Sequence, residues 1–287
     1  MAIVLGLTTA LAYGTADFLA RFSTLKLGVL RALCGTLLAG SLALSLWLAL
    51  ADTPWALLLS EWHWLVLPGL LSFGMLCLLY AALARGPISV ASPVVAIHPA
   101  LVVLCLLALG TRPSARELLG SAIVLGGGVM LATQAEQVGA GLSLSAAYVR
   151  KTALLAAACA VVLSAQILAV QHAAERLGAL AAAWGSRVFA LGCALVALAA
   201  LRPSQASLDR AGWRISWAQG LLDVTAVTAL AYGSGHGSTR AVVPVVGSAF
   251  SAVTVVMARF LLKEAMTRLQ WVAIGVVLGG ILVLGWP

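Results

Sequence analysis

Ten apolar runs follow one another along the chain, each about 20 residues long and bounded by charged residues, proline or glycine. A helix of about 20 apolar residues crosses the roughly 30 Å hydrocarbon core of a bilayer. The runs cover residues 2–22, 27–50, 63–84, 88–109, 115–134, 150–171, 178–201, 213–234, 238–260 and 268–286. No gap between them is long enough for a soluble domain. The sequence therefore predicts an all-α membrane protein with ten transmembrane helices and short connections.

The composition supports this class. Hydrophobic residues make up 62% of the chain and charged residues 9%, whereas soluble domains are typically about 45–50% apolar and about 25% charged. The net charge of +8 comes from Lys and Arg scattered singly at the ends of apolar runs. That pattern flanks membrane helices and does not form the basic face that nucleic-acid binding requires. The first run lacks a basic leader and is expected to be a retained membrane helix.

Several short segments recur about 150 residues apart. The segment "YAALARGPISVASPVV" (80–95) resembles "YGSGHGSTRAVVPVV" (232–246), and their Pro-Val-Val ends are 151 residues apart. "TADFLA" (15–20) resembles "SAQILA" (164–169) at an offset of 149, and Leu-Gly-Gly recurs at an offset of 153. The halves are predicted at 1–135 and 148–287, with a linker at 136–147. Because five crossings are an odd number, the second half enters the membrane from the opposite side, which predicts two inverted five-helix repeats, an architecture of many secondary transporters.

The distribution of Lys and Arg predicts the orientation of the chain. Twelve lie near segments that follow odd-numbered helices and four near segments that follow even-numbered ones. Because cytoplasmic loops carry the excess of basic residues, this count places both termini outside the cytoplasm.

Motifs for enzymatic chemistry are absent from the sequence. The glycines of "GSGHGS" (233–238) match neither a P-loop nor a dinucleotide-binding fingerprint. There is no G-x-S-x-G, and the four histidines have no metal-binding spacing. No enzymatic activity, cofactor or metal is therefore predicted.

Ionisable residues within the apolar runs are the first candidates for a site, because an uncompensated charge in a membrane costs several kcal/mol. Asp223 lies near the middle of its run and is expected to carry a proton or contact a substrate, or else to form a structural hydrogen bond. Arg187 is expected to hold a carboxylate or phosphate of a substrate, or to pair with Asp223 or Asp17. Asp17 precedes Arg21 by four residues, a spacing that permits a helical ion pair.

Further candidates follow from the repeat and from single polar side chains. Gln166 occupies the place of Asp17 in the second half. His98 precedes a proline within its run, which predicts either a broken helix that lines a cavity or a simple kink with a satisfied histidine. Trp184 is expected to form a cavity wall. The remaining candidates are polar handles that alternatively anchor the chain at the membrane interface: Tyr13, Tyr80 and Tyr232.

Taken together, these motifs resemble the drug/metabolite transporter superfamily and specifically its EamA-type members. "YGTADFLARFS" (13–23) is similar to the first-helix motif of the family, and Arg31 and Arg187 match an arginine early in the second helix of each half. "LLKEAMTRLQWVAIGVVLGGILVLG" (261–285) is similar to the closing segment, with Glu264 at its glutamate position. The first half departs from this pattern near Thr111, where Glu117 is a candidate replacement. The family implies cytoplasmic termini, in conflict with the charge count.

The resemblance implies a secondary transporter, often an exporter of amino acids, other metabolites or drug-like compounds, that uses a proton gradient or exchange without ATP. The expected cavity lies between the halves, lined by helices one, three, four, six, eight and nine. Few charges in the core favour a small zwitterion or a partly apolar solute. The expected partners are this solute, protons and the lipid bilayer of a bacterial inner membrane, with the chain a monomer or homodimer. The alternatives are a passive facilitator and a non-transporting membrane partner or enzyme.

Overall fold

A computed structural model describes residues 2–51, 55–110, 112–141, 144–202, 209–234, 246–247, 249–264 and 266–285. All of the long elements in these ranges are α-helices, which confirms the predicted fold class. In chain order they are α1 (Ala2–Leu27), α2 (Val29–Leu50), α3 (Trp55–Ser60), α4 (His63–Arg85), α5 (Ile88–Val95), α6 (His98–Ala108), α7 (Ala115–Gly141), α8 (Ala146–Leu177), α9 (Ala179–Leu201), α10 (Arg210–Ser234), α12 (Phe250–Leu261) and α13 (Arg268–Gly285).

The helices match the ten predicted spans in order and approximate position. Among the described residues, six spans are long and apolar enough to cross a membrane, with α5 and α6 counted together as one. The predicted linker at 136–147 is shorter than expected, because α7 continues to Gly141 and α8 begins at Ala146. The alanine, glutamate and glutamine residues at 135–137 favour helix, which explains the extension. The first part of the predicted span 238–260 lies largely outside the described residues.

The fourth span is broken in its middle. Helix α5 ends at Val95 and α6 begins at His98, with Pro99 at the start of α6. Because proline has no amide hydrogen, Pro99 cannot bond the Val95 carbonyl four residues earlier. The His98 ring fills this position, with Nδ1 at 3.2 Å from the Val95 oxygen. The expected break is therefore present, and the histidine satisfies the carbonyl that the proline leaves free.

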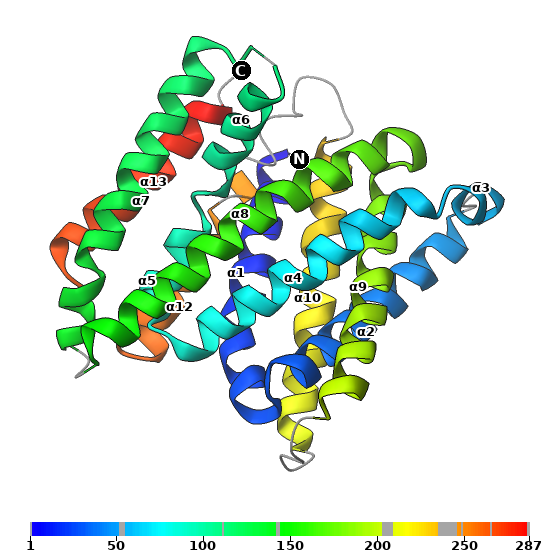
Figure 1. Ribbon diagram of the computed structural model, residues 1–287, viewed down its shortest axis with the longest axis horizontal. Helices are drawn as coiled ribbons and strands as arrows, with labels where there is room; N and C mark the ends of the chain where they lie inside the picture. The colour runs from blue at the N-terminus through cyan, green and yellow to red at the C-terminus, as the bar shows by residue number, and fades with distance from the viewer. Residues whose placement is uncertain are drawn as a thin grey trace.

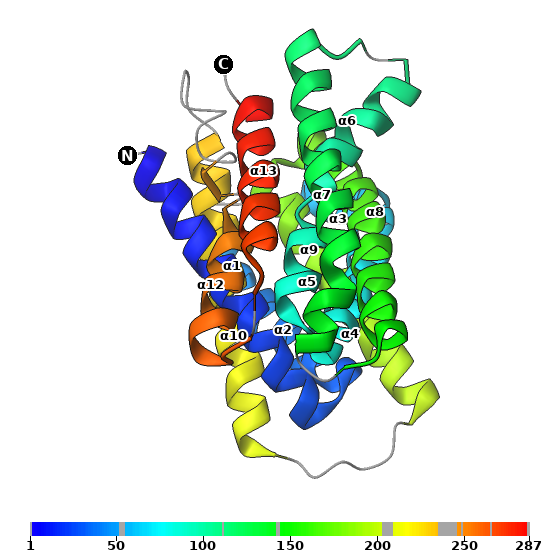
Figure 2. The same ribbon diagram turned by 90° about the vertical axis from the view of Figure 1, so that its left-hand side faces the viewer.

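The helices form one bundle with two ends (Figure 1). We call the end where α1 begins the upper end and the end where α1 finishes the lower end. Helix α13 finishes at the upper end, as an even number of crossings requires (Figures 1 and 2). The short links between α1 and α2 and between α4 and α5 lie at the lower end, and the link between α8 and α9 lies at the upper end.

Packing between helices follows the inverted repeat. The most extensive pairing joins α1 with α10, and its counterpart in the inverted half joins α8 with α4. Helix α2 packs on its own counterpart α9, and α7 on its counterpart α13 along one flank of the bundle (Figures 1 and 2). The two halves are therefore interleaved, since helices of one half find their main partners in the other.

Glycines permit the closest of these approaches. A Cβ atom at Gly220 of α10 would overlap the Thr36 carbonyl oxygen of α2. Gly127 and Gly280 bring α7 and α13 together in the same way. Small residues let helix backbones approach closely in membranes. The Gly275-x-x-x-Gly279 pair, in contrast, has nothing within 4 Å of an added Cβ, so it does not mediate packing within the described bundle.

Candidate functional site

A cavity of about 570 Å³ lies in the centre of the bundle. It is lined by residues of α1, α2, α4, α5, α6, α8, α9, α10 and α12. The described lining thus includes all six predicted helices and adds α2 and α9, the second helix of each half. Near the upper end the lining residues Ala174, Ala179 and Ala231 lie within a turn of the ends of their helices. The cavity therefore extends toward the upper end.

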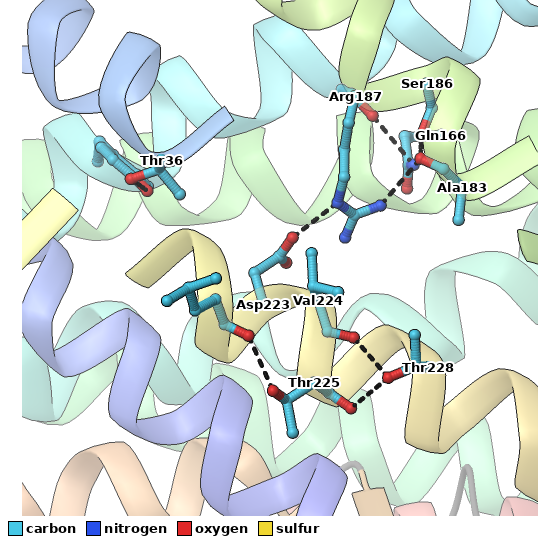
Figure 3. A network of polar contacts seen from close by, with 12 residues as sticks. Thr36, Gln166, Ala183, Ser186, Arg187, Asp223, Val224, Thr225 and Thr228 are labelled. Carbon is cyan, nitrogen blue, oxygen red and sulfur yellow. Dashed lines mark hydrogen bonds and ion pairs between the residues drawn. The ribbon is translucent and has the colours of Figure 1, made fainter. Parts of the chain in front are cut away.

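An ion pair between α9 and α10 borders the cavity (Figure 3). Nε of Arg187 lies 2.6 Å from Oδ2 of Asp223, and Nη1 of the same guanidinium donates to the Ala183 carbonyl at 3.1 Å. Both side chains are partly shielded, with 15% of Arg187 and 27% of Asp223 exposed. Arg187 was expected to hold a substrate anion or to pair with Asp223 or Asp17, and in the structure it pairs with Asp223. Tyr13 of α1 also lines the cavity, and its ring contacts that of Phe250 at a centroid distance of 6.3 Å.

Asp17 of α1 also lines the cavity, but it does not pair with Arg21. Nη1 of Arg21 instead donates to the Leu83 carbonyl at 3.3 Å. Leu83 is in the last turn of α4, where helix carbonyls lack partners within the helix and attract cations. The helical ion pair that the spacing permits is therefore not formed. Within the described residues the Asp17 carboxylate has neither a hydrogen-bonding partner nor a neutralising cation.

His98 and Gln166 face the cavity from the broken helix and from α8. The Val95 carbonyl only accepts hydrogen bonds, so its contact with Nδ1 places the proton there and leaves Nε2 as an acceptor. The His98 carbonyl, in the first turn of α6, accepts from Ser164 Oγ at 3.1 Å. Nε2 of Gln166 donates to Ser72 Oγ at 3.1 Å. Both candidates are thus held in place by a neighbouring polar group.

A chain of buried hydrogen bonds closes the cavity below. We call it the floor network, and it consists of Ser23, Thr36, Tyr80, Ser216 and Gln219. Gln219 accepts from Ser23 at 2.5 Å and donates to the Tyr80 hydroxyl at 3.0 Å. The Tyr80 hydroxyl donates to Thr36 at 3.1 Å, and Thr36 donates to the Ser216 carbonyl at 3.2 Å. The floor network thereby joins α1, α2, α4 and α10.

Two predicted site residues lie outside the cavity lining. Trp184 turns toward α2, where its indole nitrogen donates to Ser45 Oγ at 2.8 Å. Tyr232 is 49% exposed and contacts the edge of the Trp47 ring. Trp184, predicted as a cavity wall, and Tyr232, predicted as a polar side chain of the site, therefore do not line the cavity in this structure.

Sequence reasoning missed Gln219, Thr36 and Ser72, all of which line the cavity. A signal for Gln219 was present, because it precedes Asp223 by four residues and so lies on the same face of the helix. Ser72 and Thr36 are single small polar residues in apolar helices, and their sequence context does not distinguish them from serines and threonines that bond their own backbone.

At the lower end a second contact joins the two halves. The Glu264 carboxylate, 5% exposed, accepts hydrogen bonds from the amides of Ile88 and Ser89 at 3.0 and 2.9 Å. These amides open α5 and have no partner within that helix. Nearby, Lys26 contacts Asp209 at 2.7 Å and holds the pKa of that carboxyl below its usual range.

Among the described residues, the contacts of Glu117 are local to the start of α7. It accepts from the Ser114 amide at 2.6 Å, and its own amide donates to Ser114 Oγ, so the two residues form a capping box at the start of α7. The segment that would correspond to the start of α5 in the second half, near residue 239, lies outside the described residues.

A bundle of membrane-spanning helices built from two inverted repeats around a central cavity with a few polar side chains is the architecture of a membrane transporter. The model of the EamA-like transporter family matches residues 1–133 and again residues 150–286. The chain belongs to this family. A solved crystal structure of another protein has the same fold, with a TM-score of 0.70 and 21% sequence identity over 99% of this chain and 96% of that one. Among curated proteins the comparison finds no match.

Proposed function

We propose that the protein is a secondary active transporter that exports small metabolites, such as amino acids or drug-like compounds, across a bacterial inner membrane. Transport proceeds by alternating access, in which the cavity is exposed first at one end and then at the other. The coupling ion is the proton, and the energy source is its gradient.

The observation that carries this proposal is a broken symmetry. At the lower end α1 packs against α4, and the inverted counterpart of this contact is α8 against α10. Within the described residues α8 and α10 have no comparable contact. The same two helices supply cavity residues close to the upper end, including Ala174 and Ala231. Because the two contacts are equivalent in the repeat, we infer a second state of the bundle. In that state α8 contacts α10 at the upper end, and α1 separates from α4 at the lower end.

The acidic residues of the cavity support coupling to protons. Asp17 of α1 and Asp223 of α10 both line it, and these two helices pack against each other. Carboxylates inside membranes commonly relay protons in transporters. Asp223 is the carrier we propose, since protonation would release Arg187 from the 2.6 Å ion pair and change the charge presented to the solute.

Solute flux into proteoliposomes that contain the purified chain tests this function. An imposed pH gradient is expected to drive accumulation of a solute against its own gradient, and Asp223→Asn is expected to abolish the pH-driven part. Size-exclusion chromatography of the variant shows whether it remains folded and inserted. Equal flux with and without the pH gradient would contradict coupling and indicate a passive facilitator. An absence of flux over a broad solute panel would favour a non-transporting membrane partner or enzyme.

A further inference from the structure

The charges of the cavity do not cancel. Its described lining contains two carboxylates, Asp17 and Asp223, and one permanent cation, Arg187. Arg187 and Asp223 neutralise each other at 2.6 Å. The carboxyl group of Asp17 is left facing the cavity without a cation among the described residues.

None of the nearby cations among the described residues reaches Asp17. Arg21, on the same helix, bonds the Leu83 carbonyl, and Lys26 pairs with Asp209 beyond the lower end of α1. Arg187 approaches from α9 but is engaged by Asp223 and by the Ala183 carbonyl. His98, on the broken helix, directs Nδ1 to the Val95 carbonyl. An ionised carboxylate without such a partner is costly in an apolar surrounding and is neutralised either by a proton or by a positive charge that a ligand brings. A cationic ligand therefore competes with a proton for Asp17.

The remainder of the cavity is mainly apolar. Its walls include Leu163, Ile167 and Val170 of α8, together with Leu76 of α4 and Phe250 of α12. The volume of about 570 Å³ is within the range of sites for drug-sized ligands. A ligand that fits both features has a hydrocarbon or aromatic body and one charged end.

The ion pair also determines which charged groups are disfavoured. A solute carboxylate can reach the Arg187 guanidinium only in competition with Asp223, which already holds it through a short charge-assisted hydrogen bond. An ammonium group, in contrast, finds the Asp17 carboxylate free, and its three donors suit a carboxylate oxygen together with neighbouring polar groups.

Building on the proposed transport function, we infer that the solutes of this cavity are amines with an apolar body and no carboxylate, and that their ammonium group binds Asp17. This narrows the proposed substrates away from zwitterionic amino acids and toward cationic, drug-like amines.

Direct binding to the purified full-length chain tests the inference. The probes are phenethylamine, its neutral analogue 2-phenylethanol and zwitterionic phenylalanine, each titrated calorimetrically against protein in phosphatidylcholine nanodiscs. Phenethylamine is expected to bind more tightly than either analogue. Asp17→Asn is expected to weaken amine binding at least about tenfold, the effect of losing a hydrogen bond to a charged group, and Asp17→Glu to restore part of it.

The matched control is Glu175→Gln, which removes an acidic group that is exposed near the end of α8 and outside the cavity lining. It is expected to leave amine affinity unchanged, and thermal unfolding of each variant verifies its fold. Equal affinity for the amine and the alcohol, or unchanged amine affinity in a folded Asp17→Asn, would overturn the inference. Flux of zwitterions without amine binding would also overturn it while leaving the transport function intact. Amine binding without any flux would support the site and contradict transport.

Discussion

At the scale of single residues, the Arg187–Asp223 pair explains how a mostly apolar bundle holds charges in its interior. Each side chain compensates the other, and the guanidinium is further satisfied by the Ala183 carbonyl. Removing one partner leaves an uncompensated charge, whereas removing both does not. The pair therefore has two roles, since it lines the cavity and also ties α9 to α10.

This dependence gives a prediction for stability. Arg187→Met and Asp223→Asn are each expected to lower the free energy of unfolding by about 1–3 kcal/mol, the cost of leaving one group of a shielded pair unsatisfied. The double variant is expected to lose less than the two single losses combined. Denaturant titration in mixed micelles measures the three values as a double-mutant cycle. Strict additivity would contradict an energetic coupling between the two side chains.

The sequence was sufficient to select Asp223 and Arg187, because a charge inside an apolar run must find a partner. It also selected Asp17 but left its partner open, because the four-residue spacing from Arg21 permits an ion pair without requiring one. Arg21 bonds the end of α4 instead, a partner 62 residues away in the chain. Trp184 was selected because it lies one turn before Arg187, and Tyr232 was selected as a polar side chain. The direction in which each side chain points is decided by packing that the local sequence does not encode.

At the scale of elements, the start of α5 and the link between α12 and α13 depend on each other. The buried Glu264 carboxylate satisfies two amides that α5 itself leaves open. The interaction crosses from the second half to the first at the closed lower end of the cavity. It is therefore expected to stabilise the state in which that end is closed.

Replacing Glu264 tests this contact. Glu264→Ala is expected to open the lower end, since two buried amides lose their acceptor, and Glu264→Gln, which keeps one acceptor oxygen, is expected to have a smaller effect. The readout is labelling of Ser89→Cys by a water-soluble thiol reagent in a variant that lacks the five native cysteines, because Ser89 is 0% exposed. Glu117→Ala, which removes an exposed acceptor at the start of α7, is the matched control. Unchanged labelling in Glu264→Ala would contradict the proposed contribution of this carboxylate.

Helix breaks were more predictable than helix ends. The break before His98 coincides with the missing amide of Pro99, although Pro68 and Pro93 lie inside α4 and α5 without breaking them. The extension of α7 to Gly141 was missed because the glycines and polar residues at 136–145 suggested a linker. Glu117 was misread for a related reason: a glutamate three residues after a serine forms a local capping box more readily than a distant contact.

At the scale of the whole molecule, the contact of α1 with α4 and its symmetry-related counterpart, α8 with α10, indicate which helices move relative to each other during transport. Phe22 and Leu79 belong to one hydrophobic cluster at the lower end. Their counterparts at the repeat offsets of 149 and 151 are Gln171 and Leu230, which both line the open part of the cavity. In the alternate state Gln171 and Leu230 are expected to approach each other while Phe22 and Leu79 separate.

Cross-linking measures this exchange. In the variant without native cysteines, Gln171→Cys/Leu230→Cys is expected to link with a short bifunctional maleimide mainly during solute flux, because only the alternate state brings the two positions together. Phe22→Cys/Leu79→Cys, the matched pair, is expected to link at rest and less during flux. Each link is expected to stop transport. Continued flux without any link at the upper pair would contradict the exchange of contacts between the two ends.

The inverted repeat could be predicted from four short matches, because each half is a copy of one five-helix pattern. The interleaving could not, since hydrophobicity specifies that helices lie in the membrane and leaves open which of them are neighbours. Thus α1 packs mainly on α10 of the other half, and the two repeats are not separate bodies.

Helix α10 supplies partners to polar groups on helices made long before it. Gln219 accepts a hydrogen bond from Ser23 and donates one to Tyr80. The Ser216 carbonyl accepts from Thr36, and Asp223 accepts from Arg187. During synthesis Ser23, Thr36 and Tyr80 are made well before residues 210–234. These polar groups on α1, α2 and α4 are therefore expected to find their partners on α10 only after the eighth span is inserted. A fragment that ends before residue 210 is expected to leave Ser23 without the Gln219 acceptor and Thr36 without the Ser216 carbonyl.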